Sequence, residues 1–379
     1  MIYLDNAATS FPKAPGVAEA VARCLTEVGG NPGRSGHRLD REGSRIVFQA
    51  RESVCALLGI RAPERLCFTK NATEALNLAI LGSVAPGGSV ALGSLEHNAV
   101  MRPLRHLEAA RGVRLLLVPF DACGRHDPDA LRAALGARPQ LMVLNAASNV
   151  TGGLAEVEEI AAGCRAAGVP LCLDASQWAG HLPLAADDLG LAMLCFSGHK
   201  GLLGPGGTGG FYAREGFEPE PLIRGGTGSA SESEHQPEFL PDRYEAGTCN
   251  LPGLAGLLAA ARWLAATGVA AVRRREAALA DHLVRGLAGL PGVTVVGPGA
   301  GAGRAPVVSV SVPGRDLGEL AQELDRRDIA ARVGLHCAPA AHRSLGTFQA
   351  GGTLRLSPGW FTAEADLDRT LSTLEAILT

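Results

Sequence analysis

The stretch LCLDASQWAGHLPLAADDLGLAMLCFSGHK, residues 171–200, contains two short apolar runs, and each is followed at once by polar residues. The first run ends at Asp174, and the second ends at Ser197, three residues before Lys200. Apolar runs of this length predict strands that are buried on both faces. The stretch therefore predicts two core strands whose ends carry chemically useful side chains.

The same alternation of strand-like and helix-like segments extends on both sides of this stretch. Short apolar strands separated by helices of about 10–15 residues are typical of parallel β-α-β units. The sequence thus predicts an α/β fold, with one large domain over residues 14–250 built on a mostly parallel sheet. Strands are expected at 65–69, 89–94, 113–120, 140–148, 169–176 and 191–197, and helices at 44–58, 72–84, 99–110 and 155–167 and after Asp127.

The pattern of expected helices and strands changes after Pro252. Two alanine-rich helices reach about Leu290, and short strands and helices then alternate to a closing helix after Thr362. A chain of 379 residues exceeds the usual size of a single core. We therefore expect a second, smaller α+β domain formed by residues 1–13 and 251–379.

Composition excludes several classes of partner. The net charge is −3 and no basic run is present, so no nucleic-acid partner is expected. The N-terminus lacks the basic start and apolar stretch of a signal peptide. The apolar segment 253–272 is interrupted by Arg262 and is interpreted as a buried helix, not a membrane span. We expect a cytoplasmic protein with no membrane partner.

Nine cysteines are scattered along the chain without any C-x-x-C pair, so neither a disulfide framework nor a metal site is expected. Most of them lie in apolar runs. Cys337, in GLHCAP, lies instead among polar and turn residues, which favours an exposed, thiolate-capable sulfur. The alternative is a small structural residue. His336 and His342 lie near it, but their spacing fits no usual zinc finger.

Lysine is scarce, because only Lys13, Lys70 and Lys200 contribute to the 35 basic residues. Unlike arginine, a desolvated lysine can lose its proton and act as a base or form a Schiff base. Lys13, near the N-terminus, is interpreted as an ordinary surface cation. Lys200, between a histidine and a glycine-rich run, is the candidate for chemistry.

Polar clusters follow five of the expected strands, and ligands of parallel sheets lie at that edge. The segment from Asn71 to Thr73 opens a helix, whose free N–H groups suit a phosphate. Asp174 needs a cation such as a pyridinium nitrogen, and Ser197 and His199 flank Lys200 as phosphate donors. These are the parts that a pyridoxal phosphate enzyme requires. The run GPGGTG, 204–209, precedes a strand and fails the context of a dinucleotide site.

An ordered set of motifs resembles the class V aminotransferase group of fold type I pyridoxal phosphate enzymes, and within it the cysteine desulfurase family. The resemblance runs from the N-terminus to the last helix and implies the fold of that group. The motifs are LDNAATS, NPGRSGH, FTKNATEALN, EHNAV, SNVTGG, DASQ, SGHK, AGTCN and RVGLHCAP through LRLSPG.

The resemblance implies roles for the residues around the cofactor ring. Lys200 would form the covalent link to pyridoxal 5'-phosphate and move protons at the substrate Cα. Asp174 would pair with the pyridine nitrogen, His97 would stack on the ring, and Gln177 would touch the phenolic oxygen. For His97 alone, a structural role is the alternative. Cys337 would be the nucleophile that receives sulfur.

Further roles concern the phosphate and the substrate. Ala72, through its backbone N–H, and Thr73, Ser197 and His199 would hold the phosphate. Thr248 would complete this site from a second subunit, so the resemblance implies a homodimer.

Asn149, also a cofactor contact, and Arg355 would bind the substrate carboxylate, and Arg34 would lie at the mouth of the site. The implied reaction converts L-cysteine to L-alanine, leaves a persulfide on Cys337 and passes sulfur to an acceptor protein. A class V aminotransferase, a selenocysteine lyase and another C–S lyase remain alternatives. Trp360, where a smaller residue is expected, and Ala72, without a hydroxyl, leave the substrate range open.

Overall fold

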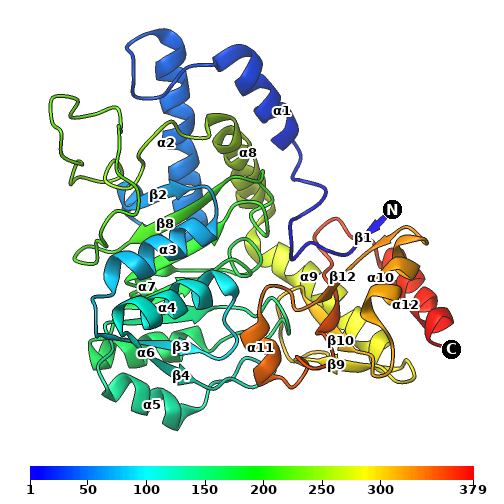
Figure 1. Ribbon diagram of the computed structural model, residues 1–379. Coiled ribbons are helices and arrows are strands. Elements are labelled where there is room, and N and C mark those ends of the chain that lie inside the picture. Colours follow the sequence, from blue (N-terminus) through cyan, green and yellow to red (C-terminus); the bar gives the residue numbers. More distant parts are fainter.

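A seven-stranded sheet organises the larger part of the molecule in the computed structural model, which describes residues 1–379 (Figure 1). Five strands run parallel side by side, from β7 to β4, and β8 alone runs against its neighbours β7 and β2. The order is β2 (Leu66–Thr69), β8 (Gly209–Ala213), β7 (Met193–Ser197), β6 (Leu171–Asp174), β5 (Leu141–Asn145), β3 (Ser89–Gly93) and β4 (Arg114–Val118).

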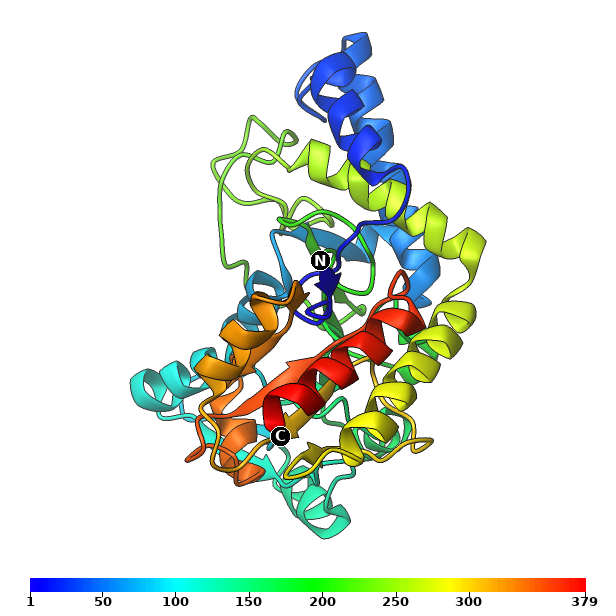
Figure 2. The ribbon, with the colours of Figure 1, turned by 90° about the vertical axis from the view of Figure 1, so that its right-hand side faces the viewer.

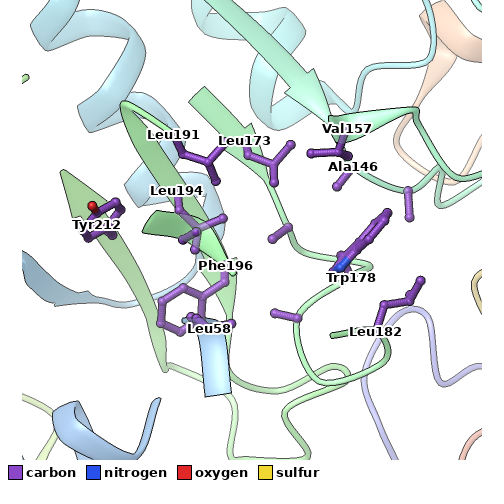
Figure 3. Close-up of a cluster of buried hydrophobic side chains, with 14 of the residues drawn as sticks. Leu58, Ala146, Val157, Leu173, Trp178, Leu182, Leu191, Leu194, Phe196 and Tyr212 are labelled. Carbon is purple, nitrogen blue, oxygen red and sulfur yellow. The ribbon is translucent and has the colours of Figure 1, made fainter. Parts of the chain in front are cut away.

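Alternate residues of the central strands serve two separate cores. In β5, Met142 and Leu144 join a core beneath one face, and Leu141 and Val143 join a core on the other. Figure 3 shows part of the first core, to which Leu58, Trp178 and the strand residues Leu173, Leu194 and Phe196 belong. Because both faces are covered, the strands are apolar at nearly every position.

Helices cover both faces of this sheet. On one face lie α2 (Arg38–Leu58), α5 (Pro128–Gly136), α6 (Val157–Ala167) and α8 (Leu251–Thr267). On the other lie α3 (Ala72–Ser83) and α4 (Asn98–Arg111). The shorter segments α1 (Val17–Arg23), η1 (Cys24–Val28), η2 (Pro63–Arg65) and α7 (Ala186–Leu189) connect these layers.

A four-stranded antiparallel sheet forms the centre of the smaller part of the molecule. Its order is β12 (Arg332–Gly334), β13 (Thr353–Leu356), β10 (Val308–Ser311) and β9 (Thr294–Val296). It shares a third core with α9 (Val269–Ala288), α10 (Leu317–Asp325) and α12 (Glu364–Leu378). Near the N-terminus, β1 (Ile2–Tyr3) pairs in parallel with β11 (Ile329–Ala330), so the chain begins beside this part (Figures 1 and 2).

The predicted α/β class with a large, mostly parallel sheet is confirmed. The predicted division at residue 250 stays a prediction. Apolar residues of α8 share the core of the larger sheet, whereas those of α9 from Leu279 onward share that of the smaller one. The helix expected at 44–58 begins earlier, at Arg38, because the His37 ring accepts a hydrogen bond from the N–H of Asp40 and caps the helix.

The apolar segment 253–272 is not one helix. It breaks at Gly268, whose φ of 84° lies in the left-handed region, and α8 and α9 meet at 83°. Membrane-spanning length and apolarity are found in no single helix; only this bent pair meets both criteria when its two halves are taken together. The expected burial of α8 is confirmed, since ten of its 17 residues are buried.

Candidate active site

A cavity of about 190 Å³ lies at the carboxyl edge of the large sheet. The segments that follow β2, β3, β5, β6 and β7 all contribute to its wall, as expected for parallel strands whose ends share an edge. Its lining residues are Asn71, Ala72, Thr73, His97, Ala99, Asn145, Asn149, Asp174, Ser176, Gln177, Ser197, His199 and Lys200. The structure therefore gathers nine of the thirteen sequence-predicted site residues around one space.

The start of α3 forms an anion-binding corner of the cavity. Asn71 caps the helix by accepting from the N–H of Glu74, and the N–H of Ala72 donates to Ser197 Oγ at 3.3 Å. The N–H and the hydroxyl of Thr73 have no hydrogen-bond partner in the chain. Free donors at the positive end of a helix dipole bind phosphate readily.

A glycine allows β8 to pass close to this corner. A Cβ at Gly209 would lie 2.6 Å from the Cα of Asn71, so only glycine fits here without a shift of the backbone. The run GPGGTG thus leads into β8 and not into a helix, as the sequence predicted.

Asp174 ends β6 with a carboxylate that is only partly satisfied. The residue is 3% exposed, and the N–H and hydroxyl of Ser176 both donate to Oδ1, at 2.9 and 2.5 Å. No hydrogen bond reaches Oδ2. A buried carboxylate with an open oxygen favours a cationic partner in the cavity.

Lys200 follows β7 and reaches the same cavity. Burial lowers the pKa of its amine to about 8; Asp174 opposes this shift, and Arg355 and Arg332 add to it. An appreciable fraction of the amine is therefore unprotonated near neutral pH. This is the form that acts as a nucleophile or base.

His97 lines the cavity as the N-cap of α4. Its Nδ1 accepts from the N–H of Ala99 at 3.0 Å, and burial, followed by the charge of Lys200, lowers its pKa to about 4. The ring is therefore neutral at neutral pH and carries its proton on Nε2. Gln177, also on the wall, donates through Nε2 to the carbonyl of Ala7.

Glu96, beside His97, is a positioning residue that sequence reasoning missed. It is 1% exposed, its Oε1 accepts from the N–H of Asn145 at 2.9 Å, and its Oε2 has no partner. The contact ties the β3–α4 loop to β5. Burial raises the pKa of this carboxyl from 4.5 to about 8.

Glu96→Gln is expected to flatten the pH dependence of stability. Because the folded pKa is raised, the folded protein holds a proton that the unfolded chain releases, so wild-type stability falls between pH 4.5 and 8. The glutamine variant should escape this fall, which is on the order of a few kcal/mol. Urea unfolding at pH 5 and pH 8 measures it. Glu108→Gln, on an exposed site, is the control, and equal slopes for all three proteins would refute the role of Glu96.

Cys337 lies on a tightly held loop between β12 and α11 (Pro339–Ser344). His336 and Cys337 have left-handed φ angles of 46° and 57°, which non-glycine residues adopt only where surrounding contacts impose them. The carbonyl of His336 accepts from Asn149 Nδ2 at 2.7 Å, and that of Cys337 from the N–H of Asn98 at 2.8 Å.

The side chain of Cys337 is exposed, as predicted, whereas six of the other cysteines are buried. Nη2 of Arg332 lies 3.4 Å from its sulfur. Sequence reasoning missed Arg332, because it belongs to a strand of only three residues that has no signal of its own. His336 and His342 are buried with lowered pKa values and bond to Thr353 and Thr347, so they support the loop.

Arg355 is held next to the cavity but is not part of its wall. It is 1% exposed; its Nη2 donates to Asp5 Oδ1 at 2.8 Å and its Nη1 to the carbonyl of Asn149 at 3.1 Å. Its Nε and the Oδ1 of Asn149 have no partner. In the predicted carboxylate clamp one nitrogen, Nε, therefore has no partner, and the substrate roles of Arg355 and Asn149 stay predictions.

Thr248 and Arg34 lie away from the cavity of this chain. Thr248 lines a separate pocket with Tyr244, and exposed Arg34 donates to the carbonyl of Gly226 at 2.8 Å. Thr248 belongs to the long segment between β8 and α8, which projects from the larger part (Figure 1), and Arg34 contacts the same segment. The role of Thr248 in a second subunit and that of Arg34 at the mouth of the site stay predictions.

Arg51 anchors that long segment. Its guanidinium pairs with both carboxylate oxygens of Glu245, at 2.7 and 3.0 Å, and lies 4.9 Å from the centre of the Phe68 ring. Its side chain is 8% exposed. Removal of Arg51 would leave Glu245 unpaired in a half-buried position.

Arg51→Ala is expected to lower the free energy of unfolding by about 3 kcal/mol, the loss typical of a broken buried pair. Urea unfolding measures the change. In Arg61→Ala, where an exposed guanidinium pairs with Asp187, the loss should stay below about 1 kcal/mol. Equal losses in the two variants would contradict an anchoring role for Arg51.

Lys13 is not the surface cation that the sequence suggested. It is half-buried, and its amine donates to Thr9 Oγ1, Ser10 Oγ and the carbonyl of His199, at 3.3, 3.0 and 3.0 Å. Burial lowers its pKa to about 8. The interpretation was wrong because the contact with His199 joins segments 186 residues apart, and Lys13 thereby holds the backbone next to Lys200.

Trp360 packs away from the cavity wall. Its ring lies 5.7 Å from that of Trp263 on α8, and the guanidinium of Arg275 lies 5.5 Å from its centre. The bulky residue therefore fills the junction of α8 and α9, and it does not narrow the cavity.

Comparison with known proteins agrees with this fold and site. Residues 2–370 match the family described as Aminotransferase class-V, and the chain belongs to this family. A probable cysteine desulfurase of Mycobacterium leprae is 34% identical over 382 residues, which cover 97% of this chain and 90% of the relative.

Solved structures give the same result. A cysteine desulfurase from Thermococcus onnurineus superposes with a TM-score of 0.93 at 31% identity, covering 100% of this chain and 94% of that one. One from Escherichia coli gives a TM-score of 0.88 at 27% identity, covering 99% and 94%. Cysteine desulfurase is thus the enzyme type that the similarities support, and the resemblance stated from the sequence is confirmed.

Proposed function

We propose that the protein is a cytoplasmic, homodimeric cysteine desulfurase that uses pyridoxal 5'-phosphate to convert L-cysteine to L-alanine and collects the sulfur on Cys337. One observation carries the proposal. A single cavity combines the open carboxylate of Asp174, the amine of Lys200 and the free donors of Thr73, and the exposed Cys337 lies in an adjoining cavity that shares Thr73 and His97. None of the nine cysteines is paired, which fits a reducing compartment.

The donor set of the cavity fits the cofactor. Thr73, Ser197 and His199 would hold the phosphate, since His199 uses only Nδ1, toward Thr9, within the chain. Asp174 Oδ2 would accept from the pyridine N–H, and the amine of Lys200 would hold the aldehyde carbon. When bound, the cofactor supplies an electron sink for the electrons released at the substrate Cα.

Lys200 and Asp174 would have separate roles in holding and transferring protons. The negative charge of Asp174 would keep a proton on the pyridine nitrogen. The amine of Lys200, whose pKa is lowered to about 8, would take the proton from the substrate Cα and return one to the product. The free Nε of Arg355 would orient the substrate carboxylate.

Cys337 would then act as the nucleophile on sulfur. Its thiolate attacks the substrate sulfur, a new S–S bond forms and the substrate C–S bond breaks. The electron pair of the broken bond passes to the substrate Cβ, which takes up a proton, and the product that leaves is alanine. The net change is L-cysteine plus a Cys337 thiol to L-alanine plus a Cys337 persulfide. Arg332, 3.4 Å from the sulfur, would stabilise negative charge on it.

Product analysis tests the proposal. Purified protein with bound cofactor is incubated with L-cysteine, and we expect alanine together with a mass gain of one sulfur atom on the peptide that contains Cys337. Pyruvate would indicate a C–S lyase, and a reaction that requires a keto acid would indicate an aminotransferase. Activity with selenocysteine alone would indicate a selenocysteine lyase.

The homodimer would complete the phosphate site. Thr248 lies beside the half-exposed Leu222 and Ile223 in a pocket of about 160 Å³, and a second copy seated there could exchange Thr248 residues between the two sites. Light scattering should give twice the mass of one chain. The acceptor of sulfur is proposed to be a further thiol.

A further inference from the structure

A groove that Cys337 lines adjoins the cofactor cavity. It has a volume of about 410 Å³ and runs between α3 and α4, and its lining residues recur every four positions along both helices. Thr73 and His97 belong to the groove and to the cofactor cavity alike, so the two spaces adjoin, and Cys337 lines the groove. The outer lining residues are Asn77, Leu81, Asn98, Arg102 and His106.

The groove carries an uncompensated positive charge. Arg102 is exposed and makes no ion pair or hydrogen bond, and no carboxylate is among the lining residues. By contrast Arg105, on the same helix but outside the groove, pairs with Glu108 at 2.6 Å. Together with Arg332 beside the sulfur, Arg102 favours an anionic occupant.

From these features we infer that the groove binds a small thiol that carries carboxylates and that this thiol takes the sulfur from Cys337. The inference rests on the proposed function and names its acceptor class. The volume suits a ligand of the size of a short peptide. A carboxylate on Arg102 would leave the thiol end of such a ligand free to approach Cys337 along the groove.

The transfer step balances without any further reagent. The acceptor thiolate attacks the outer sulfur of the Cys337 persulfide, the acceptor S–S bond forms and the bond to Cys337 Sγ breaks. The products are the acceptor persulfide and the Cys337 thiolate, which is ready for another cysteine.

Transfer kinetics with two probes test the inference. Holoenzyme loaded with persulfide is mixed with glutathione, an anionic thiol, or with 2-mercaptoethanol, an uncharged one. Arg102→Gln should raise the KM for glutathione about tenfold, the effect of one lost charge-assisted hydrogen bond, and leave 2-mercaptoethanol unchanged. Arg105→Gln, the matched control, should change neither.

Three outcomes would overturn the inference. Arg102→Gln and Arg105→Gln could give the same KM for glutathione, both thiols could lose rate equally in Arg102→Gln, or transfer could occur only to a protein thiol. Failure of the proposed function looks different, because the wild-type protein would then form no persulfide. Alanine formed in a single turnover should be the same in wild type and Arg102→Gln, since Arg102 lies outside the cofactor cavity.

Discussion

Lys200→Ala is expected to abolish the formation of alanine from L-cysteine, with a loss of at least about 10³-fold. The variant removes both the covalent anchor and the only amine on the cavity wall that can take the Cα proton. The phosphate corner at Thr73 and Ser197 stays intact, so the variant should still bind pyridoxal 5'-phosphate without a covalent link. Alanine release measures the first effect, and loss of borohydride-stable labelling measures the second.

Lys70→Ala is the matched control for this variant. Lys70 is exposed, and its amine lies 3.8 Å from Glu74, outside the cofactor cavity. It should keep both activity and labelling. If covalent labelling survived in Lys200→Ala and disappeared in Lys70→Ala, Lys70 would be the residue linked to the cofactor. The assignment of this role to Lys200 would then be refuted.

Cys337→Ala is expected to lower the rate of sulfur release from L-cysteine by about 10³-fold, while the cofactor remains linked to Lys200. The exposed thiol is the only cysteine that lines either the cofactor cavity or the adjoining groove, so no other sulfur can replace it. The fold should be kept, because alanine fills no more space than cysteine. Alanine release and the mass of the loop peptide report the loss.

Cys123→Ser provides the comparison, since Cys123 is half-exposed but lies at the turn between Asp121 and Arg125, outside both spaces. This variant should keep full activity. Undiminished desulfuration by Cys337→Ala would show that the persulfide forms elsewhere and would leave Cys337 with a structural role.

The position of the cofactor cavity was predictable from the sequence, because the carboxyl ends of parallel strands lie at the same edge of a sheet. The buried runs that end at Thr69, Asn145, Asp174 and Ser197 are continuous and apolar, so their identity as strands needed no knowledge of tertiary contacts. Once they were placed in a parallel sheet, their polar ends had to meet at one edge. The order of the strands was not predictable in this way, nor was the reversed direction of β8.

The missed residues act through contacts between distant segments. Glu96 bonds to Asn145, 49 positions away, and Lys13 bonds to the backbone of His199. Such pairs have no local periodicity. Their environment, and with it the direction of their pKa shifts, exists only after the chain has folded. Thr248 and Arg34 are a different case, because the contacts within a single chain do not bring either residue to the cavity.

The paired left-handed residues at 336 and 337 determine how sulfur can leave the protein. The loop is fastened by Asn149 on one side and by the first N–H of α4 on the other. Backbone contacts therefore hold the loop on both sides of Cys337, and we expect the persulfide to stay in place until an acceptor thiol reaches it. The rate of sulfur transfer should rise with the concentration of the acceptor thiol until the binding site for this thiol is saturated. Stiffening the loop further should leave the transfer rate unchanged.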